Sequence, residues 1–175
     1  MLTRSLMRLT MVAAVASLVF ASQASAATTM GESYSGSGGI SCTYGGTMIQ
    51  SVSPGPEYAA PYDGVITSWS NMGYFWSTVT FKVARLGSGG TYTVIGSDGP
   101  QTKAFDGQLA TYPTRISVRQ GDVIGARVPY GGYYCPYSYG GVYAYGTDDA
   151  DVAVGATGYF DSTTGYKAPI QATIE

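Results

Sequence analysis

Apolar and polar residues alternate along much of the chain after about residue 65. The alternation is found in segments 65–69, 79–84, 91–94 and 115–119, in a mostly apolar run at 123–128, and again at 142–145, 152–156 and 170–174. A period of two places one face of a strand in a core and the other in water. No window beyond the first 26 residues shows the 3.6-residue period of an amphipathic helix. We therefore predict an all-β chain.

Glycine-containing turn sequences separate these predicted strands. Asp63-Gly64, residues 87–90 and Gln120-Gly121-Asp122 lie between alternating segments, and Asp98-Gly99-Pro100 is predicted to end the strand before it. Glycine tolerates the positive φ that tight turns require. Short strands joined by such turns predict an antiparallel, jelly-roll-like β-sandwich, with a closed barrel of the same strands as the alternative.

The first 26 residues have a different character. Arg4 and Arg8 precede an apolar stretch from about Leu9 to Phe20, and Ala24-Ser25-Ala26 follows it. This order is typical of a secretory signal peptide, and we expect cleavage after Ala26. The apolar stretch is shorter than the ~20 residues of a membrane-spanning helix. The mature chain is therefore expected to be secreted and not inserted in a membrane.

The mature chain is expected to form one domain. Residues 27–39 are small and polar, which predicts a flexible leader, and residues 40–175 form the predicted β-sandwich domain. Loss of Arg4 and Arg8 leaves seven basic and eleven acidic residues, a net charge of −4. No cluster of Lys and Arg is present, so nucleic acid is not an expected partner.

Two cysteines remain after cleavage. Cys42 and Cys135 would enter an oxidising compartment, where such a pair is usually bridged. We therefore predict a disulfide, with two free buried thiols as the alternative.

The middle of the chain resembles a known group of proteins. Segments 64–70, 79–85, 91–96 and 113–125 follow one another in an order similar to that of small, secreted, largely uncharacterised bacterial β-sandwich proteins. Those proteins tend to carry an early cysteine and a second one after a Gly-Asp hairpin, as Cys42 and Cys135 stand relative to Gly121-Asp122. The resemblance covers about residues 40–175. It implies the fold and export, and it implies no activity because its motifs are strands and turns.

The absence of certain residues narrows the chemistry. The sequence has no histidine, so neither a Ser-His-Asp nor a Cys-His arrangement can form, and His-ligated metals are excluded. No phosphate-binding or dinucleotide motif is present, so we expect no nucleotide or redox cofactor. The protein is therefore predicted to be non-catalytic. A glycoside hydrolase using two carboxylates is the catalytic alternative, but most of the Asp residues lie in predicted turns.

One short segment is strongly acidic. Asp148, Asp149 and Asp151 could supply oxygen ligands to a structural Ca²⁺. The segment lacks the spacing of an EF-hand loop, so a solvated acidic turn is the favoured interpretation.

Tyrosine and glycine dominate the segment from Tyr130 to Tyr145. A tyrosine ring offers a flat apolar face and a polar tip, and Tyr-Gly-Ser loops make adaptable binding surfaces. Tyr143 and Tyr145 share a strand face and are predicted to be structural. The candidate ligand-binding residues are Tyr130, Tyr133, Tyr134, Tyr137, Tyr139 and Trp76.

These tyrosines lead to two hypotheses of function. The first is extracellular recognition, with a polysaccharide or an extracellular protein as the partner, and carbohydrate is favoured because flat rings stack on sugars. The second is a structural or matrix protein of the cell exterior without a discrete ligand, which the low charge, the Gly-Tyr richness and the absence of catalytic groups favour. In the corresponding interpretation of the segment, some tyrosines alternate into the core and the rest lie on a loop. Trp69, in phase with Val65 and Thr67, is predicted to be buried in either case.

Overall fold

The computed structural model describes residues 26–33, 43–52, 58–72, 78–102, 108–134, 137–145, 150–159 and 161–175. Side chains are described for the same residues apart from 43–44, 133–134, 137–145 and 161–166. This part of the chain consists of strands and connecting segments without a helix. The strands are β1 (Thr28–Glu32), β2 (Thr43–Ile49), β3 (Gly64–Asn71), β4 (Thr78–Leu86), β5 (Thr91–Thr102), β6 (Ala110–Val118), β7 (Val123–Tyr134), β8 (Tyr137–Tyr145), β9 (Thr157–Tyr159), β10 (Asp161–Lys167) and β11 (Ile170–Ile174).

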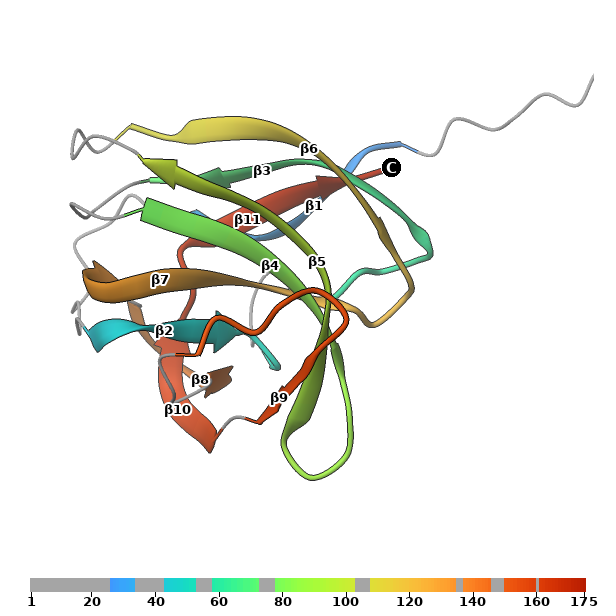
Figure 1. Cartoon of the computed structure of the whole chain (residues 1–175). Helices are drawn as coiled ribbons and strands as arrows, with labels where there is room; N and C mark the ends of the chain where they lie inside the picture. Colours follow the sequence, from blue (N-terminus) through green and yellow to red (C-terminus); the bar gives the residue numbers. More distant parts are fainter. Residues whose placement is uncertain are drawn as a thin grey trace, which may run out of the picture.

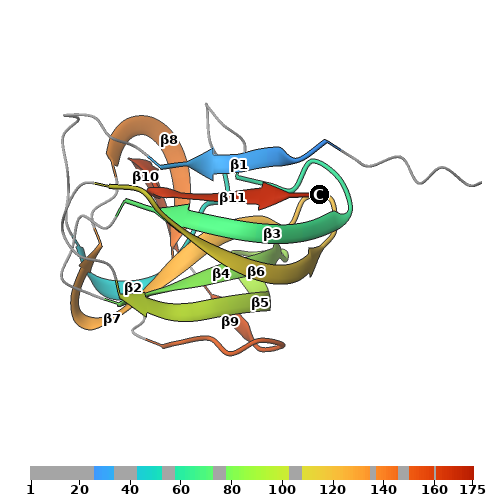
Figure 2. The same cartoon turned by 90° about the horizontal axis from the view of Figure 1, so that it is seen from above.

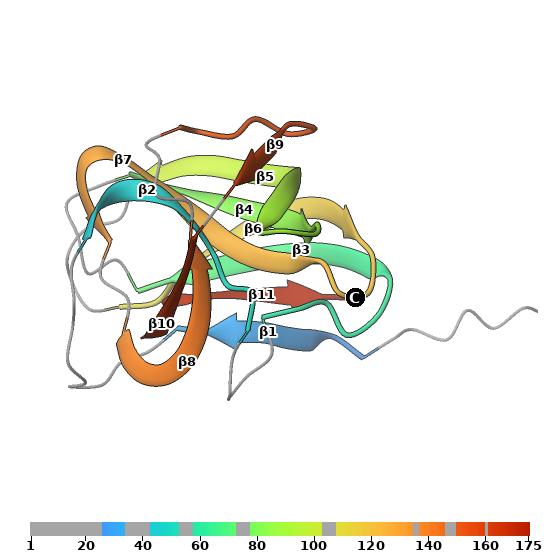
Figure 3. The same cartoon turned by 90° about the horizontal axis from the view of Figure 1, so that it is seen from below.

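The strands form two antiparallel sheets packed face to face (Figure 1). One sheet has four strands in the order β1-β11-β3-β6, and the other has seven in the order β10-β8-β2-β7-β4-β5-β9. Seen from above, the four strands of the first sheet lie side by side over the second (Figure 2). Seen from below, β8 curves strongly near one edge of the larger sheet (Figure 3). The predicted all-β sandwich is confirmed, with two sheets in place of one closed barrel.

The main hydrophobic core lies between the two sheets. Alternate residues of the central strands supply it, for example Phe81 and Val83 of β4 and Ile124 and Ala126 of β7. Trp69 of β3 is fully buried there, as predicted, and stacks on Phe81 with ring centroids 5.4 Å apart. Such parallel stacking adds to the area burial of the two rings.

A second, smaller apolar cluster lies on the opposite face of the seven-stranded sheet. It contains Ile49, Ala84, Tyr92, Val94 and Val123. Residues 150–156, here called the strap, pass over this cluster, and Val152 packs against it. The C-terminal end of the strap is held by backbone hydrogen bonds, since the Val94 nitrogen donates to the Ala156 carbonyl at 3.1 Å and the Gly155 nitrogen donates to the Val94 carbonyl at 2.7 Å. Segment 152–156 was predicted to be a strand from its apolar alternation, and that prediction is wrong.

The predicted flexible leader also needs correction. Thr28–Glu32 form strand β1, which pairs along its length with β11, and the Met30 side chain is only 1% exposed. The sandwich therefore begins at residue 28 and not at residue 40, because β1 completes one edge of the four-stranded sheet.

The prediction that Asp98-Gly99-Pro100 ends a strand is wrong. This segment lies inside β5, where the Gly99–Pro100 peptide is cis and the register with β4 shifts nearby.

Among the described residues there is no helix of the length and apolarity needed to cross a membrane.

Candidate functional site

A wide bulge interrupts the pairing of β7 with β2. Tyr44 faces Tyr133 and Gly46 faces Val128, so a single residue of β2 lies opposite four residues of β7, Pro129 to Gly132. Four residues cannot pair with one, so the extra backbone must leave the ladder. We call Pro129–Gly132 the tyrosine bulge.

The local sequence explains why the bulge forms here. Proline within a sheet is confined to edges and bulges because it has no N–H to donate to the ladder. Gly131 has a φ of 86°, a backbone conformation that favours glycine. Across the ladder, a Cβ on Gly45 would collide with the Pro129 carbonyl, so only glycine fits there. Val128, buried in the main core, anchors the start of the bulge.

Tyr130 stands at the middle of the tyrosine bulge. Its side chain is 77% exposed, the largest exposure among the described large hydrophobic residues. Pro129 and Gly131 on either side are also exposed, whereas Gly132 is buried. The ring is thus displayed on a backbone that is fixed at both ends by the β2–β7 ladder, which leaves its flat face available for stacking.

The other predicted ligand-binding residues can be placed only in part. Tyr133 and Tyr134 are the last residues of β7, where they pair with Tyr44 and Thr43, and Tyr137 and Tyr139 lie on β8. These four therefore continue the chain directly after the tyrosine bulge. Their side chains, like Trp76, lie outside the described residues. The two residues between β7 and β8 are outside the description as well.

Of the three aspartates in the acidic segment, Asp151 is described by the structure, and Asp148 and Asp149 lie outside the described residues. The Asp151 carboxylate accepts a hydrogen bond from the Lys82 ammonium at 2.6 Å. Lys82 is 4% exposed and Asp151 60% exposed, so the strap covers a buried cation. Lys82 also donates to the Val152 carbonyl at 3.1 Å. No group of three or more Asp, Glu or Cys residues that could hold a metal ion is found in the described part.

Sequence reasoning missed Lys82 as a structural residue, although a signal was present. Lys82 lies between Phe81 and Val83, whose side chains are in the main core, so it must point to the other face of the sheet. Arg127 of β7 is buried as well. The alternation of β4 thus placed Lys82 on the face opposite the main core, but the local sequence could not show that the strap covers Lys82.

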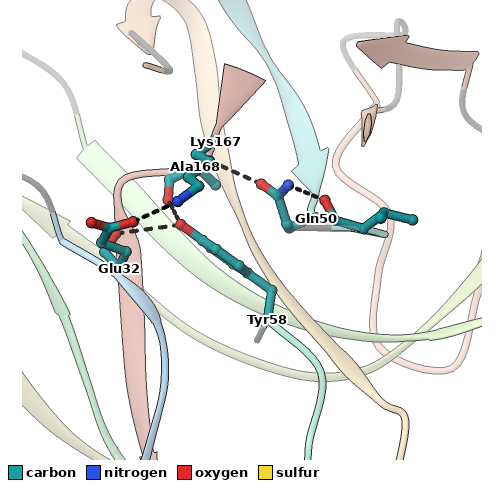
Figure 4. Close-up of polar contacts among 6 residues, drawn as sticks. Glu32, Gln50, Tyr58, Lys167 and Ala168 are labelled. Carbon is teal, nitrogen blue, oxygen red and sulfur yellow. Dashed lines mark hydrogen bonds and ion pairs between the residues drawn. The ribbon is translucent and has the colours of Figure 1, made fainter. Parts of the chain in front are cut away.

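A second buried polar network closes the end of the sandwich where β1, β2 and the β10–β11 connection meet (Figure 4). The Tyr58 hydroxyl donates to the Ala168 carbonyl at 2.5 Å, and the Ala168 nitrogen donates to the Gln50 side chain at 3.0 Å. Lys167 donates to the Glu32 carboxylate at 2.9 Å. Burial raises the pKa of the Tyr58 hydroxyl, and the nearby Glu32 charge adds to the effect.

The remaining described carboxylates with assigned hydrogen bonds serve separate parts of the fold. Asp122 is bound to Arg85 through two contacts of 2.8 and 2.9 Å, and this hydrogen bonding raises the pKa of Arg85. Asp98 accepts from the Trp69 indole at 2.5 Å, and Asp63 from the Gln120 nitrogen at 2.7 Å. The bonds of Asp122, Asp98 and Asp63 therefore stabilise, in turn, the Asp122 turn, the Trp69 ring in the core and the loop at Gln120, which is a structural role for each carboxylate.

Comparison of the chain with protein-family models, with curated proteins and with solved structures gave no match. The geometry of the molecule is therefore the basis for any statement on its function.

Proposed function

We propose that this protein is an exported, non-catalytic β-sandwich module that binds carbohydrate through Tyr130 and the tyrosine-rich segment that follows it. The observation that carries the proposal is the tyrosine bulge, which holds an exposed aromatic ring on backbone fixed at both ends by the β2–β7 ladder. A ring held in this way loses little conformational freedom when it binds, which favours affinity.

The chemistry of tyrosine favours sugar as the ligand class. The ring presents an apolar face to the C–H groups of a pyranose, and the hydroxyl can exchange hydrogen bonds with sugar hydroxyls. Tyr133, Tyr134, Tyr137 and Tyr139 follow in the next nine residues of the chain. A row of such residues is suited to several units of a polysaccharide.

The glycoside hydrolase alternative has less support. It requires two carboxylates that flank one bond of a bound sugar, about 5 to 9 Å apart. Glu32, Asp98, Asp122 and Asp151 are each bonded to a different residue, in four separate places of the fold. Each of these bonds has a structural explanation, so a recognition role through aromatic rings is the better proposal.

The binding test uses the mature, oxidised chain, residues 27–175, on a glycan array and on insoluble polysaccharides, with and without Ca²⁺. We expect binding to at least one glycan and a loss of affinity of about tenfold or more in Tyr130→Ala, the equivalent of one stacking contact worth about 1.4 kcal/mol.

The matched control is Tyr159→Ala. Tyr159 is also an exposed tyrosine, at 59%, but it lies on β9 at an edge of the seven-stranded sheet. Unchanged binding in this variant would show that the loss of affinity is specific to the tyrosine of the bulge and does not follow from removing any exposed tyrosine. Equal losses in both variants, or no glycan bound under any condition, would reject the proposal and favour the structural role.

Export is part of the proposal and has its own test. N-terminal sequencing of protein recovered from outside the producing cell should begin at Ala27, one residue before β1. A chain that keeps residues 1–26 would contradict it.

A further inference from the structure

The tyrosine bulge is a stretch of β7 that no neighbouring strand pairs with. In the described part of the chain, the ladder with β4 covers residues 123–127 of β7, and the ladder with β2 covers residues 125–128 and 133–134. Pro129–Gly132 thus lie in neither ladder, although ladder pairs flank them on both sides. Strand backbone without a partner offers its N–H and C=O groups to another molecule, as the edge of a sheet does. The predicted disulfide between Cys42 and Cys135 lies outside the described residues and stays a prediction.

The backbone groups within reach of a ligand are those of Tyr130 and Gly131. The Pro129 carbonyl faces β2, where it excludes a Cβ on Gly45, and Gly132 is buried. Tyr130 and Gly131 are both exposed, and each has one N–H donor and one C=O acceptor. The exposed ring of Tyr130 is attached to this same piece of backbone, so a single ligand can contact the ring and the peptide groups together.

We propose that the tyrosine bulge recognises a sugar that carries an acetamido group, so that the ligand is a polymer of N-acetylhexosamine. An acetamido group has an N–H and a C=O in the fixed arrangement of a peptide, and it pairs with the peptide groups of Tyr130 and Gly131 as a second strand would. The pyranose ring that carries it stacks on the ring of Tyr130. This inference rests on the proposed function, because it names the ligand class of the same site.

The charge of the molecule favours a neutral ligand of this kind. The tyrosine bulge consists of proline, tyrosine and two glycines, without a charged side chain, and the expected mature chain has seven basic and eleven acidic residues. An acidic molecule repels a polysaccharide of uronic acids, whereas an acetamido group is polar without a charge. Recognition by neutral hydrogen bonds and ring stacking therefore suits the composition of the site.

Gly131 determines the direction of the peptide groups on either side of it. Its φ is 86°, and a Cβ at this position would have no atom within 4 Å. Gly131→Ala therefore causes no collision but strains the backbone, and the strain is relieved by turning the adjoining peptide groups. Gly155 of the strap has a φ of 87° and equally open surroundings, so Gly155→Ala is a matched control in another part of the fold.

The first experiment compares three soluble tetramers with the same β-1,4 linkage, made of N-acetylglucosamine, glucose and glucosamine, by calorimetry on the mature protein. We expect the acetylated tetramer to bind about tenfold or more tightly than the glucose tetramer, because a site that hydrogen-bonds a group discriminates against the analogue that lacks it. Equal affinities for these two would overturn the inference. Equal binding of the glucosamine tetramer would also overturn it, since a positive charge would then replace the amide.

The second experiment measures the preference for the acetylated over the glucose tetramer in three variants. Tyr130→Ala should weaken both ligands by a similar factor, because it removes the stacking that they share. Gly131→Ala should reduce the preference to about threefold or less, while Gly155→Ala should keep it. A preference that survives in Gly131→Ala, or that falls equally in Gly155→Ala, would show that the backbone of the bulge does not read the acetamido group.

The tetramers also separate this inference from the proposed function. If glycans bind and Tyr130→Ala weakens them without any preference for the acetamido group, the carbohydrate proposal stands and this inference falls. If no glycan binds, both fall. Retention of the protein on insoluble chitin and on bacterial peptidoglycan distinguishes the two polymers that carry N-acetylhexosamine. Retention on either supports the inference, and retention on neither would overturn it.

Discussion

Asp122 joins two separate parts of the chain through one buried carboxylate. It is 1% exposed, it binds the Arg85 guanidinium of β4 through both oxygens, and it accepts the Arg119 backbone N–H at 2.6 Å. We predict that Asp122→Ala lowers the free energy of unfolding by about 1–3 kcal/mol, because a buried carboxylate that accepts hydrogen bonds from the Arg85 guanidinium and the Arg119 N–H is lost. Urea denaturation followed by tryptophan fluorescence measures the change.

The control for this substitution is an aspartate with a similar turn position but no burial. Asp63 is exposed and accepts a single backbone N–H from Gln120. Asp63→Ala should cost less than about 1 kcal/mol, since water can replace the lost acceptor. Equal costs at the two positions would contradict the role assigned to burial at Asp122.

Tyr58 should make the protein sensitive to alkaline pH. Burial raises the pKa of its hydroxyl in the folded protein above the value of about 10 that it has in the unfolded chain. The folded state therefore holds the Tyr58 proton more tightly. The stability that this contributes is fully present below about pH 10 and is lost as pH rises from there toward the raised pKa of the folded state.

The prediction is tested by following the free energy of unfolding between pH 8 and pH 12 in the wild-type protein and in Tyr58→Phe. Stability of the wild type should fall above about pH 10. The variant should be less stable at pH 8, because the hydroxyl no longer donates to Ala168, but its decline above pH 10 should be shallower. Parallel curves would show that Tyr58 does not carry the effect.

At the scale of elements, local sequence predicted strands where apolar side chains alternate. Segments 65–69, 79–84 and 170–174 lie inside the observed strands β3, β4 and β11, and segment 115–119 lies in β6 up to Val118. The reason is that their pattern directly encodes one buried face, as the residues of the main core confirm. The turn at Gln120-Gly121 was also predicted correctly, and Gly121 has the positive φ of 87° that such a turn uses.

Strands defined by long-range packing could not be predicted in this way. In β1, Gly31 is required because a Cβ there would collide with the Ile170 carbonyl of β11, and in β2, Gly45 is required by the Pro129 carbonyl of β7. These glycines indicate a flexible leader or a loop when they are considered locally. The sequence likewise showed that the segment of the tyrosine bulge is rich in tyrosine and glycine. It could not show that four of its residues leave the ladder, because this depends on the register of β7 with β2.

Two buried lysines hold two different elements, which gives a paired prediction. Lys82 bonds to Asp151 and the Val152 carbonyl of the strap, and Lys167 bonds to Glu32 at the end of β1. We predict that Lys82→Met raises amide exchange in residues 150–156 and leaves β1 unchanged, because only the strap loses its contacts. Lys167→Met should raise exchange in β1 and leave the strap unchanged.

Each of these variants is the control for the other. Methionine keeps the length and apolar stem of lysine, so both variants remove a buried charge and its bonds with little change in volume. Exchange measured by mass spectrometry on both variants should therefore give two separate local patterns. A uniform increase across both sheets in either variant would contradict the assignment of that lysine to one element.

For the whole molecule, the order of strands determines which edges are open to other chains. Within the described part of the chain, the edges of the four-stranded sheet are β1 and β6, and those of the seven-stranded sheet are β10 and β9. β1 has five residues and β9 three, and the pairing of β10 with β8 is interrupted by a register shift. β6 is longer, but it carries Pro113 and an exposed Arg115. Short strands, irregular pairing, proline and charge all hinder edge-to-edge association.

We therefore predict that the mature protein is a monomer, and that β6 is the edge where this is most easily changed. Pro113→Val/Arg115→Val restores a missing N–H donor and removes the charge, so light scattering coupled to gel filtration should show association that grows with concentration. The control, Ser68→Val/Thr173→Val, adds two valines on the central strands β3 and β11 and should stay monomeric. Association of the wild-type protein would instead favour a structural role, because a matrix protein must present an edge or face that binds its own copies.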